Sequence, residues 1–131
     1  MRIVLVGAVE GSRIAFEALV EAGYSPAILV TLPPEAAERH SDFADLTTPA
    51  RRLGIDVHHT TNINRAETID TIAVIRPDLT LVLGWSQICQ RPFREIARIG
   101  AVGFHPAALP RLRGRGVIPW TILRNEPTAG S

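Results

Sequence analysis

The sequence predicts a single α/β domain built on a parallel β-sheet with helices on both faces. Three observations predict it. Short apolar, β-branched runs alternate with segments of helical periodicity, the two kinds of segment recur at the spacing of strand–helix–strand units, and several of them stop at a glycine. The length of 131 residues and the 46% share of hydrophobic residues fit one domain with a real core, over residues 1–131.

Five segments have the character of strands. The first, from Arg2 to Val6, is apolar and ends at Gly7. The others are residues 27–30, 55–60, 79–84 and 101–104. The run 79–84 is the most apolar, whereas 55–60 is the most polar, which predicts an edge position for 55–60.

Four segments between these strands have the character of helices. The first, residues 12–22, begins at a capping Ser12 and stops at Gly23; the others are 46–53, 65–75 and 92–99. The pair Pro33-Pro34 and the polar residues up to about Ser41 predict a mobile loop. Right-handed crossovers then give a three-layer, Rossmann-like sheet in the order 3-2-1-4-5.

Composition excludes several classes of function. All 14 basic residues are arginine, so chemistry that needs a lysine amine, such as a Schiff base or a Walker-type phosphate lysine, is excluded. The single cysteine, Cys89, excludes an internal disulfide framework and a cysteine zinc cluster. No apolar run reaches the roughly 18 residues of a membrane span, and the first residues lack the flanks of a signal peptide. We therefore expect a cytoplasmic protein without membrane contact.

Charge is unevenly distributed along the chain. Residues 1–90 carry 7 arginines and 11 acidic residues, whereas residues 91–131 carry 7 arginines and 2 acidic residues. An anionic ligand is therefore expected to meet the C-terminal third. Few aromatic residues interleave with these arginines, so the pattern gives little support to a nucleic-acid partner.

Ligands of such sheets bind outside the carboxyl ends of the strands, so three loops are candidates: 7–12, 84–90 and 105–116. The first loop fits neither a dinucleotide nor a P-loop motif, and Glu10 places a negative charge where phosphates would lie. A smaller anion could bind the backbone amides of Gly11, Ser12 and Arg13 at the start of the helix. A tight strand-to-helix turn explains the glycines equally well.

Other polar residues carry weaker signals. His58 and His59 are neighbours on a strand and point to opposite faces, so they are not expected to chelate one metal. His40 lies in the polar loop and carries no signal of its own. No basic residue is adjacent to Cys89 to activate it as a nucleophile. We expect no metal site.

The most informative stretch runs from Gly103 to Gly116 and contains His-Pro-x-x-Leu-Pro-x-x-Arg-Gly, beginning at His105. A histidine at the end of a buried strand lies where α/β enzymes place catalytic groups. This string resembles the signature of the 10-formyltetrahydrofolate-dependent formyltransferases, which act on glycinamide ribonucleotide, methionyl-tRNA and amino sugars. The resemblance extends to Leu83-Gly84-Trp85-Ser86-Gln87-Ile88, similar to the folate-binding loop, and to the stretches 119–123 and 126–131. It covers essentially the whole chain.

The resemblance implies a reaction and a set of catalytic groups. An acceptor amine attacks the formyl carbon on the folate, and the family supplies His, Asn and Asp as acid, oxyanion donor and base. His105 matches the His, whereas Gly103 stands at the position of the Asn. The family's Asp follows the turn in which this sequence ends, at Ser131, and no Asp follows Asp78. The resemblance therefore implies a form truncated at its C-terminal end, whose own activity is uncertain; a natural stand-alone remnant is the other interpretation.

The resemblance also assigns binding residues. For the folate donor they are Trp85, Ser86, Gln87, Ile88, Cys89 and Gln90, through backbone groups and an apolar lining; Trp85 is expected to pack rather than stack, and Arg91 could reach the glutamate tail. For the amine acceptor they are Gly11, Ser12, Arg13, Pro110, Arg113 and Gly114. The acceptor is expected to be a small molecule, and an amino sugar is favoured over a ribose phosphate. A homodimer is compatible with the family. Two alternatives remain: a formyltetrahydrofolate hydrolase, and a folate-binding module without catalysis, which Gly103 and the missing Asp favour.

Overall fold

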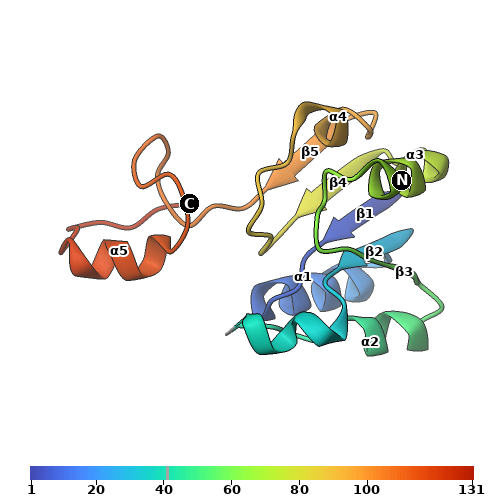
Figure 1. Cartoon of the computed structure of the whole chain (residues 1–131), viewed down its shortest axis with the longest axis horizontal. Coiled ribbons are helices and arrows are strands. Elements are labelled where there is room, and N and C mark those ends of the chain that lie inside the picture. The colour runs from blue at the N-terminus through green and yellow to red at the C-terminus, as the bar shows by residue number, and fades with distance from the viewer. Residues whose placement is uncertain (41) are drawn as a thin grey trace.

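The computed structural model describes residues 1–40 and 42–131. Its centre is a sheet of five parallel strands in the order β3-β2-β1-β4-β5, which confirms the predicted fold class and strand order (Figure 1). The strands are β1 (Ile3–Val6), β2 (Ile28–Thr31), β3 (Asp56–His59), β4 (Leu79–Val82) and β5 (Gly100–Gly103). The polar strand β3 lies at one edge of the sheet, as expected, and β5 lies at the other.

Helices lie on both faces of the sheet (Figure 1). The helices that cover the sheet are α1 (Glu10–Glu21), α2 (Thr47–Arg52), α3 (Ala66–Ile75) and α4 (Arg91–Arg94), with a short 3-10 helix, η1 (Pro34–Arg39); a further helix, α5 (Val117–Leu123), lies beyond the sheet (Figure 1). In Figure 1, α1 and α2 lie below the sheet, and α3 and α4 lie above it. The three layers bury β1 and β2 on both faces, which explains their continuous apolar sequences.

Alternate side chains of β1 face two separate cores. Val4 packs above the sheet with Ile72 of α3 and Phe93 of α4, all of them buried. Leu5 packs below the sheet with Phe16 of α1. Successive side chains of a strand point to opposite faces, so this one strand anchors both layers of helices.

The structure differs from the sequence prediction after β1, after β2 and after β4. Helix α1 begins at Glu10 with Val9 as its N-cap, so Ser12 lies within its first turn instead of capping it. Residues 34–39 of the expected mobile loop form η1, and Ser41, where that loop was expected to end, lies outside the described residues. The helix expected over 92–99 spans only 91–94. The chain leaves it early because the amides of Arg98 and Ile99 donate to Pro77 and Asp78 beside the start of β4, which brings the chain into position for β5. Strands β2 and β5 are each shifted by one residue from the expected bounds.

The segment from Phe104 to Ser131 lies beyond β5, beside the layered body rather than within it (Figure 1). Its helix α5 leaves Ile118, Ile122 and Leu123 more than 60% exposed. Few side chains of this segment are buried; Ala107 and Val117 are the two apolar ones. The C-terminal segment is therefore held far less firmly than the sheet.

The histidine pair behaves as its strand position predicts. His59 Nε2 lies 2.9 Å from the hydroxyl of Thr47 in α2, whereas His58 Nε2 lies 3.0 Å from that of Thr68 in α3. The two rings thus bond to helices of opposite layers. Within residues 1–40 and 42–131, no group of three His, Cys, Asp or Glu side chains could hold a metal ion. In the same residues no helix is long and apolar enough to cross a membrane.

Candidate active site

Strand β1, strand β4 and helix α1 meet at two glycines. A Cβ on Gly7 would lie 2.4 Å from both the carbonyl oxygen of Leu83 and the hydroxyl of Ser12. Gly84 has a φ of +69°, and a Cβ there would lie 2.1 Å from a methyl of Val9. The Ser12 hydroxyl donates to Leu83 O at 2.6 Å and accepts from the Val9 amide at 3.2 Å. The chain therefore needs glycine at both places, where the loops after β1 and β4 come together.

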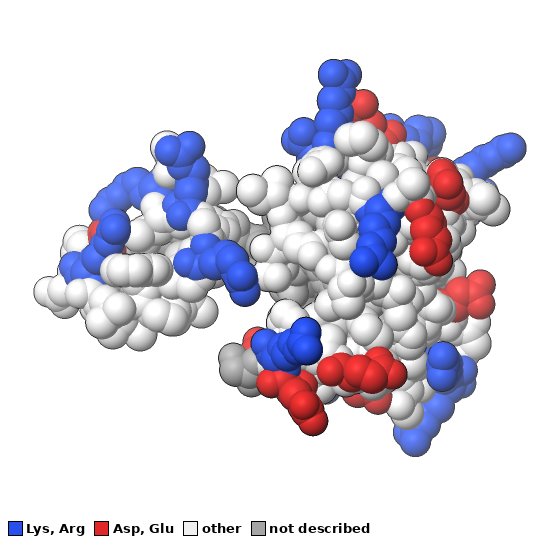
Figure 2. All heavy atoms as spheres, in the orientation of Figure 1, with Lys and Arg blue, Asp and Glu red and all other residues white. Residues whose placement is uncertain are grey.

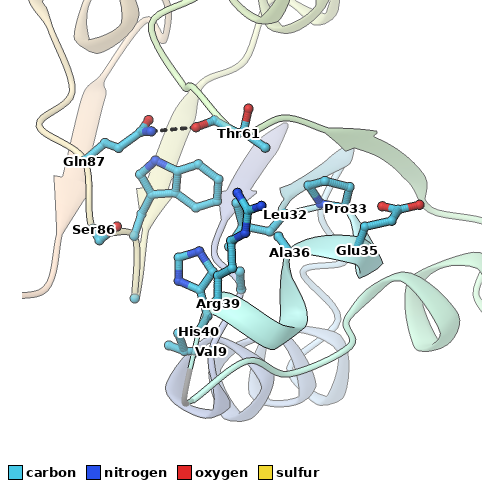
Figure 3. A pocket seen from close by; sticks show the side chains of 13 residues that line it. Val9, Leu32, Pro33, Glu35, Ala36, Arg39, His40, Thr61, Ser86 and Gln87 are labelled. Atoms are coloured by element: carbon cyan, nitrogen blue, oxygen red, sulfur yellow. Dashed lines mark hydrogen bonds between the residues drawn. The ribbon is translucent and has the colours of Figure 1, made fainter.

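A cavity of about 430 Å³ opens at this carboxyl edge of the sheet (Figure 3). Four loops line it, those that follow β1, β2, β3 and β4. Figure 3 shows Arg39 and His40 on the side of η1, facing Ser86 on the loop after β4. Glu35 adds a carboxylate to the same wall. The cavity lies at the switch in strand order, between β1 and β4, where ligands of doubly wound sheets bind.

Two of the three backbone donors predicted to hold an anion at the start of α1 are already engaged. The amides of Ser12 and Arg13 both donate to Val9 O, at 2.8 and 3.1 Å. The guanidinium of Arg13 pairs with Glu10 and Glu17, and it lowers the pKa of Glu10. This geometry does not favour an anion there, so the role of Gly11, Ser12 and Arg13 in acceptor binding stays a prediction.

The loop of residues 84–90 combines buried and exposed side chains. Trp85 packs against the upper core and also lines the cavity, in agreement with a packing role. Its indole Nε1 is buried and has no hydrogen-bond partner among the described residues. Ile88, by contrast, is 87% exposed. Burial raises the pKa of the Cys89 thiol, which argues against a nucleophilic role for it.

His105 follows β5, at the same edge of the sheet as the loop 84–90. Its Nε2 lies 3.0 Å from the carbonyl oxygen of Leu112, and its own carbonyl accepts from the amide of Ala107. A carbonyl oxygen can only accept, so Nε2 carries the proton and Nδ1 is the nitrogen left to exchange one. The half-buried ring is thereby oriented by the loop that it supports.

Gly103, two residues before His105, ends β5 without steric need for glycine. Its φ lies outside the left-handed region, and a Cβ there would have only Val82 O nearby, at 3.6 Å. A side chain would fit. The strand therefore presents a backbone but no side-chain donor at the position that the resemblance assigns to an asparagine.

The arginines of the C-terminal segment surround a separate hollow of about 420 Å³. Arg113 and Arg115 line it together with Arg124, whose guanidinium carbon lies 5.4 Å from the ring centre of Trp120. Pro110 lines the same hollow, whereas Arg111 turns away to pair with Glu126. Figure 2 shows these arginines gathered on the C-terminal segment. The predicted acceptor residues thus lie in two places, at α1 and in this basic hollow.

Comparisons with known proteins agree with this geometry. The chain is 34% identical over 134 residues to the methionyl-tRNA formyltransferase of Halorhodospira halophila and 30% identical over 132 residues to that of Chloroflexus aggregans. These matches cover 98% and 99% of the chain and 42% and 43% of the relatives. No family model matches it.

Solved structures show the same fold. The structure superposes on phosphoribosylglycinamide formyltransferase from Bacillus halodurans with a TM-score of 0.75 and 18% identity, over 95% of this chain and 66% of that one. Glycinamide ribonucleotide transformylase 1 from Symbiobacterium toebii gives 0.72 and 17%, over 99% and 63%. The chain is thus similar to methionyl-tRNA formyltransferases over nearly its whole length, and it has the fold of glycinamide ribonucleotide formyltransferases. It spans about two fifths of the length of the curated formyltransferases that it matches.

Several residues around the cavity escaped the sequence prediction. Arg39 and His40 line the cavity wall although their loop gave no signal, because η1 brings them over the sheet edge. Thr61 and Asn64 follow β3, and they contact the loop 84–90. The polar residues after β3 are the signal from which Thr61 and Asn64 could have been predicted, because every loop that follows a parallel strand reaches this edge of the sheet.

Proposed function

We propose that this domain transfers a formyl group from 10-formyltetrahydrofolate to an amine, with His105 as the acid and oxyanion stabiliser. The position of His105 carries the proposal. It follows an edge strand paired with β4, and the loop after β4 lines the cavity at the switch in strand order. Similarity to formyltransferases over nearly the whole chain supports the same reaction.

The residues of the loop 84–90 fit a folate donor. The donor would supply an activated formyl carbon, and Trp85, Ser86, Gln87, Ile88, Cys89 and Gln90 would bind it through the backbone and an apolar lining. Trp85 lines the cavity, and its buried indole Nε1 has no hydrogen-bond partner among the described residues, as is also true of the hydroxyls of Thr31 and Thr80. This unsatisfied donor is compatible with a ligand bound beside Trp85.

The orientation of His105 supports either direction of proton transfer. With Nε2–H donated to Leu112, a neutral ring can accept the proton of the amine at Nδ1. A protonated ring can instead donate Nδ1–H to an oxyanion. One nitrogen thus carries the chemistry while the other fixes the ring.

The acceptor is proposed to be a small molecule with an amine, bound from the side of η1. Glu35 offers a carboxylate for an ammonium group, and Arg39 offers a cation for an anionic part of the molecule. Arg113 and Gly114 remain candidates for an anion in the basic hollow; Gly114, at a φ of +110°, provides the turn there. A cytoplasmic location and a role in one-carbon metabolism follow from the same proposal.

The His105→Ala variant tests the proposal, in the protein at its full natural length. Loss of a general acid–base group is expected to lower the turnover of 10-formyltetrahydrofolate by about 10²- to 10⁴-fold. Binding of 5-formyltetrahydrofolate, a chemically stable folate, should change little, because His105 lies outside the loop 84–90. An unchanged turnover would refute the catalytic role.

Gly103 favours a second candidate, a folate-binding module without catalysis, because it offers no side-chain donor for the oxyanion. The same measurements separate the two functions. Folate binding with no formyl transfer by the wild-type protein supports the module, whereas transfer that depends on His105 supports the enzyme.

A further inference from the structure

Two loops at the cavity edge hold each other through side-chain amides. The Gln87 side chain reaches from the loop after β4 to the loop after β3. Its Nε2 donates to the carbonyl of Thr61 at 2.6 Å (Figure 3). Its Oε1 accepts from the amide of Ile63 at 2.9 Å. Both polar atoms of the side chain are therefore engaged. The two bonds hold the side chain against the loop after β3.

Asn64 makes the reciprocal pair of bonds. Its Nδ2 donates to the carbonyl of Ile88 at 3.0 Å, and its Oδ1 accepts from the amide of Gln90 at 2.8 Å. Each loop thus gives one amide side chain to the backbone of the other. The four bonds join residues 24 to 26 positions apart in the sequence. We call Asn64 and Gln87 together the amide clamp.

The clamp rests on a firm base on the β3 side. The Thr60 hydroxyl, in a buried residue, accepts from the amide of Asn62 and donates to its carbonyl. The Asn62 side chain in turn accepts from the amide of Asn64 at 3.0 Å. Ile63 between them is fully buried in the upper core. Asn64 is therefore fixed to the core, and the loop 84–90 is fixed to Asn64.

The Asn64 side chain bonds to residues on either side of Cys89, namely to the carbonyl of Ile88 and the amide of Gln90. The loop has no helix or strand of its own, and Ile88 is almost fully exposed. Ordering a free backbone costs about 1–2 kcal/mol per residue. A loop already held in shape spares a ligand that cost when it binds.

We propose that Asn64 and Gln87 are positioning residues that hold the loop 84–90 in the shape that receives the formyl donor. This inference rests on the proposed function, because that function makes this loop the donor site. Gln87 was expected to bind the folate through the backbone of its loop, and the inference gives its side chain the separate role of shaping that loop. It also adds Asn64, on a different strand's loop, to the residues on which donor affinity depends.

The test measures the affinity of the full-length protein for 5-formyltetrahydrofolate by titration calorimetry. Asn64→Ala and Gln87→Ala are each expected to weaken binding about tenfold, and the double variant by less than the product of the two, since both hold one loop. Asn64→Asp keeps the acceptor for the Gln90 amide but loses the donor, so it should lie between wild type and alanine. Asp70→Asn, an exposed change on α3, is the control and should bind as wild type.

Thermal unfolding of the same variants distinguishes a positioning role from a general loss of stability. Positioning predicts weaker binding at temperatures where every variant is fully folded, and partial recovery in Asn64→Asp. Equal affinities for wild type and both alanine variants overturn the proposal.

Hydrogen exchange of the Gln90 amide distinguishes failure of the inference from failure of the proposed function. Asn64→Ala should speed this exchange, because the amide loses its acceptor. If wild type does not bind the folate, the proposed function fails. Faster exchange in Asn64→Ala then still supports a clamp that orders the loop, and unchanged exchange overturns it.

Discussion

The loops 84–90 and 105–116 lie at the same edge of one sheet but are held in different ways. The first is rooted between two glycines that pack against α1, and the amide clamp bonds it to the loop after β3. The second is held by local backbone turns, by one side-chain bond from His105 to Leu112 and by an ion pair between Arg111 and Glu126. The contrast teaches that this domain fixes its proposed donor loop through the core, whereas it carries its proposed catalytic histidine on a weakly supported segment.

The largest expected effect comes from disturbing the root of the first loop. Gly84→Ala should lower the free energy of unfolding by about 2–5 kcal/mol, because its Cβ would meet Val9 and Ser12 and its left-handed φ disfavours a side chain. Urea unfolding measures it. Gly11→Ala is the matched control: its Cβ would meet nothing, and alanine in helix α1 should stabilise by about 0.5–1 kcal/mol. Equal effects at the two glycines would show that the first loop is not tightly rooted.

A gain of function would sharpen the role of the second region. Gly103→Asn has room for its side chain and places an amide two residues before His105. If the proposed reaction lacks an oxyanion donor there, the formyl-transfer rate should rise by about tenfold to a hundredfold, somewhat less than the loss caused by removing such a donor elsewhere. Gly103→Ala, which adds a Cβ but no donor, should leave the rate unchanged. A rate in Gly103→Asn no higher than in Gly103→Ala contradicts the role of this position.

The smallest expected effect concerns Cys89 in the first loop. Burial raises its pKa, so at pH 8 a smaller fraction is thiolate than in a free cysteine, and alkylation by iodoacetamide should be severalfold slower than that of glutathione. As the pH is raised, the alkylation rate of Cys89 should level off at a higher pH than that of the free thiol. Asn64→Ala, which loosens the loop, should speed alkylation. Reaction as fast as that of glutathione in the wild-type protein would contradict a firmly held loop.

The sheet could be predicted from the sequence because its signals are local. The apolar runs of β1 and β2 are buried by layers on both faces, and the glycines after β1 and β4 mark tight turns. The shortened helix α4 could not be predicted, because it ends where the amides of Arg98 and Ile99 find carbonyls at the start of β4, a contact between distant segments.

The site divides in the same way. The motif and the strand end indicated His105 and the loop 84–90, since both are consecutive residues with a recognisable spacing. The amide clamp was missed because it joins single polar residues of two loops, and neither Asn64 nor Gln87 forms a motif by itself. The engaged amides at the start of α1 were missed for a similar reason, since the sequence does not show that Val9 O accepts both of them.

The two glycines at the root of the loop 84–90 have a consequence for how this domain can evolve. Gly7 and Gly84 have no room for a side chain, so substitutions at these positions are expected to be eliminated because they destabilise the fold. Ser86 and Ile88, a few residues along, are exposed and free of such contacts, so they can change with little effect on folding. Because the start of the loop is fixed and its exposed residues can vary, ligand preference can diverge between relatives while the sheet stays the same.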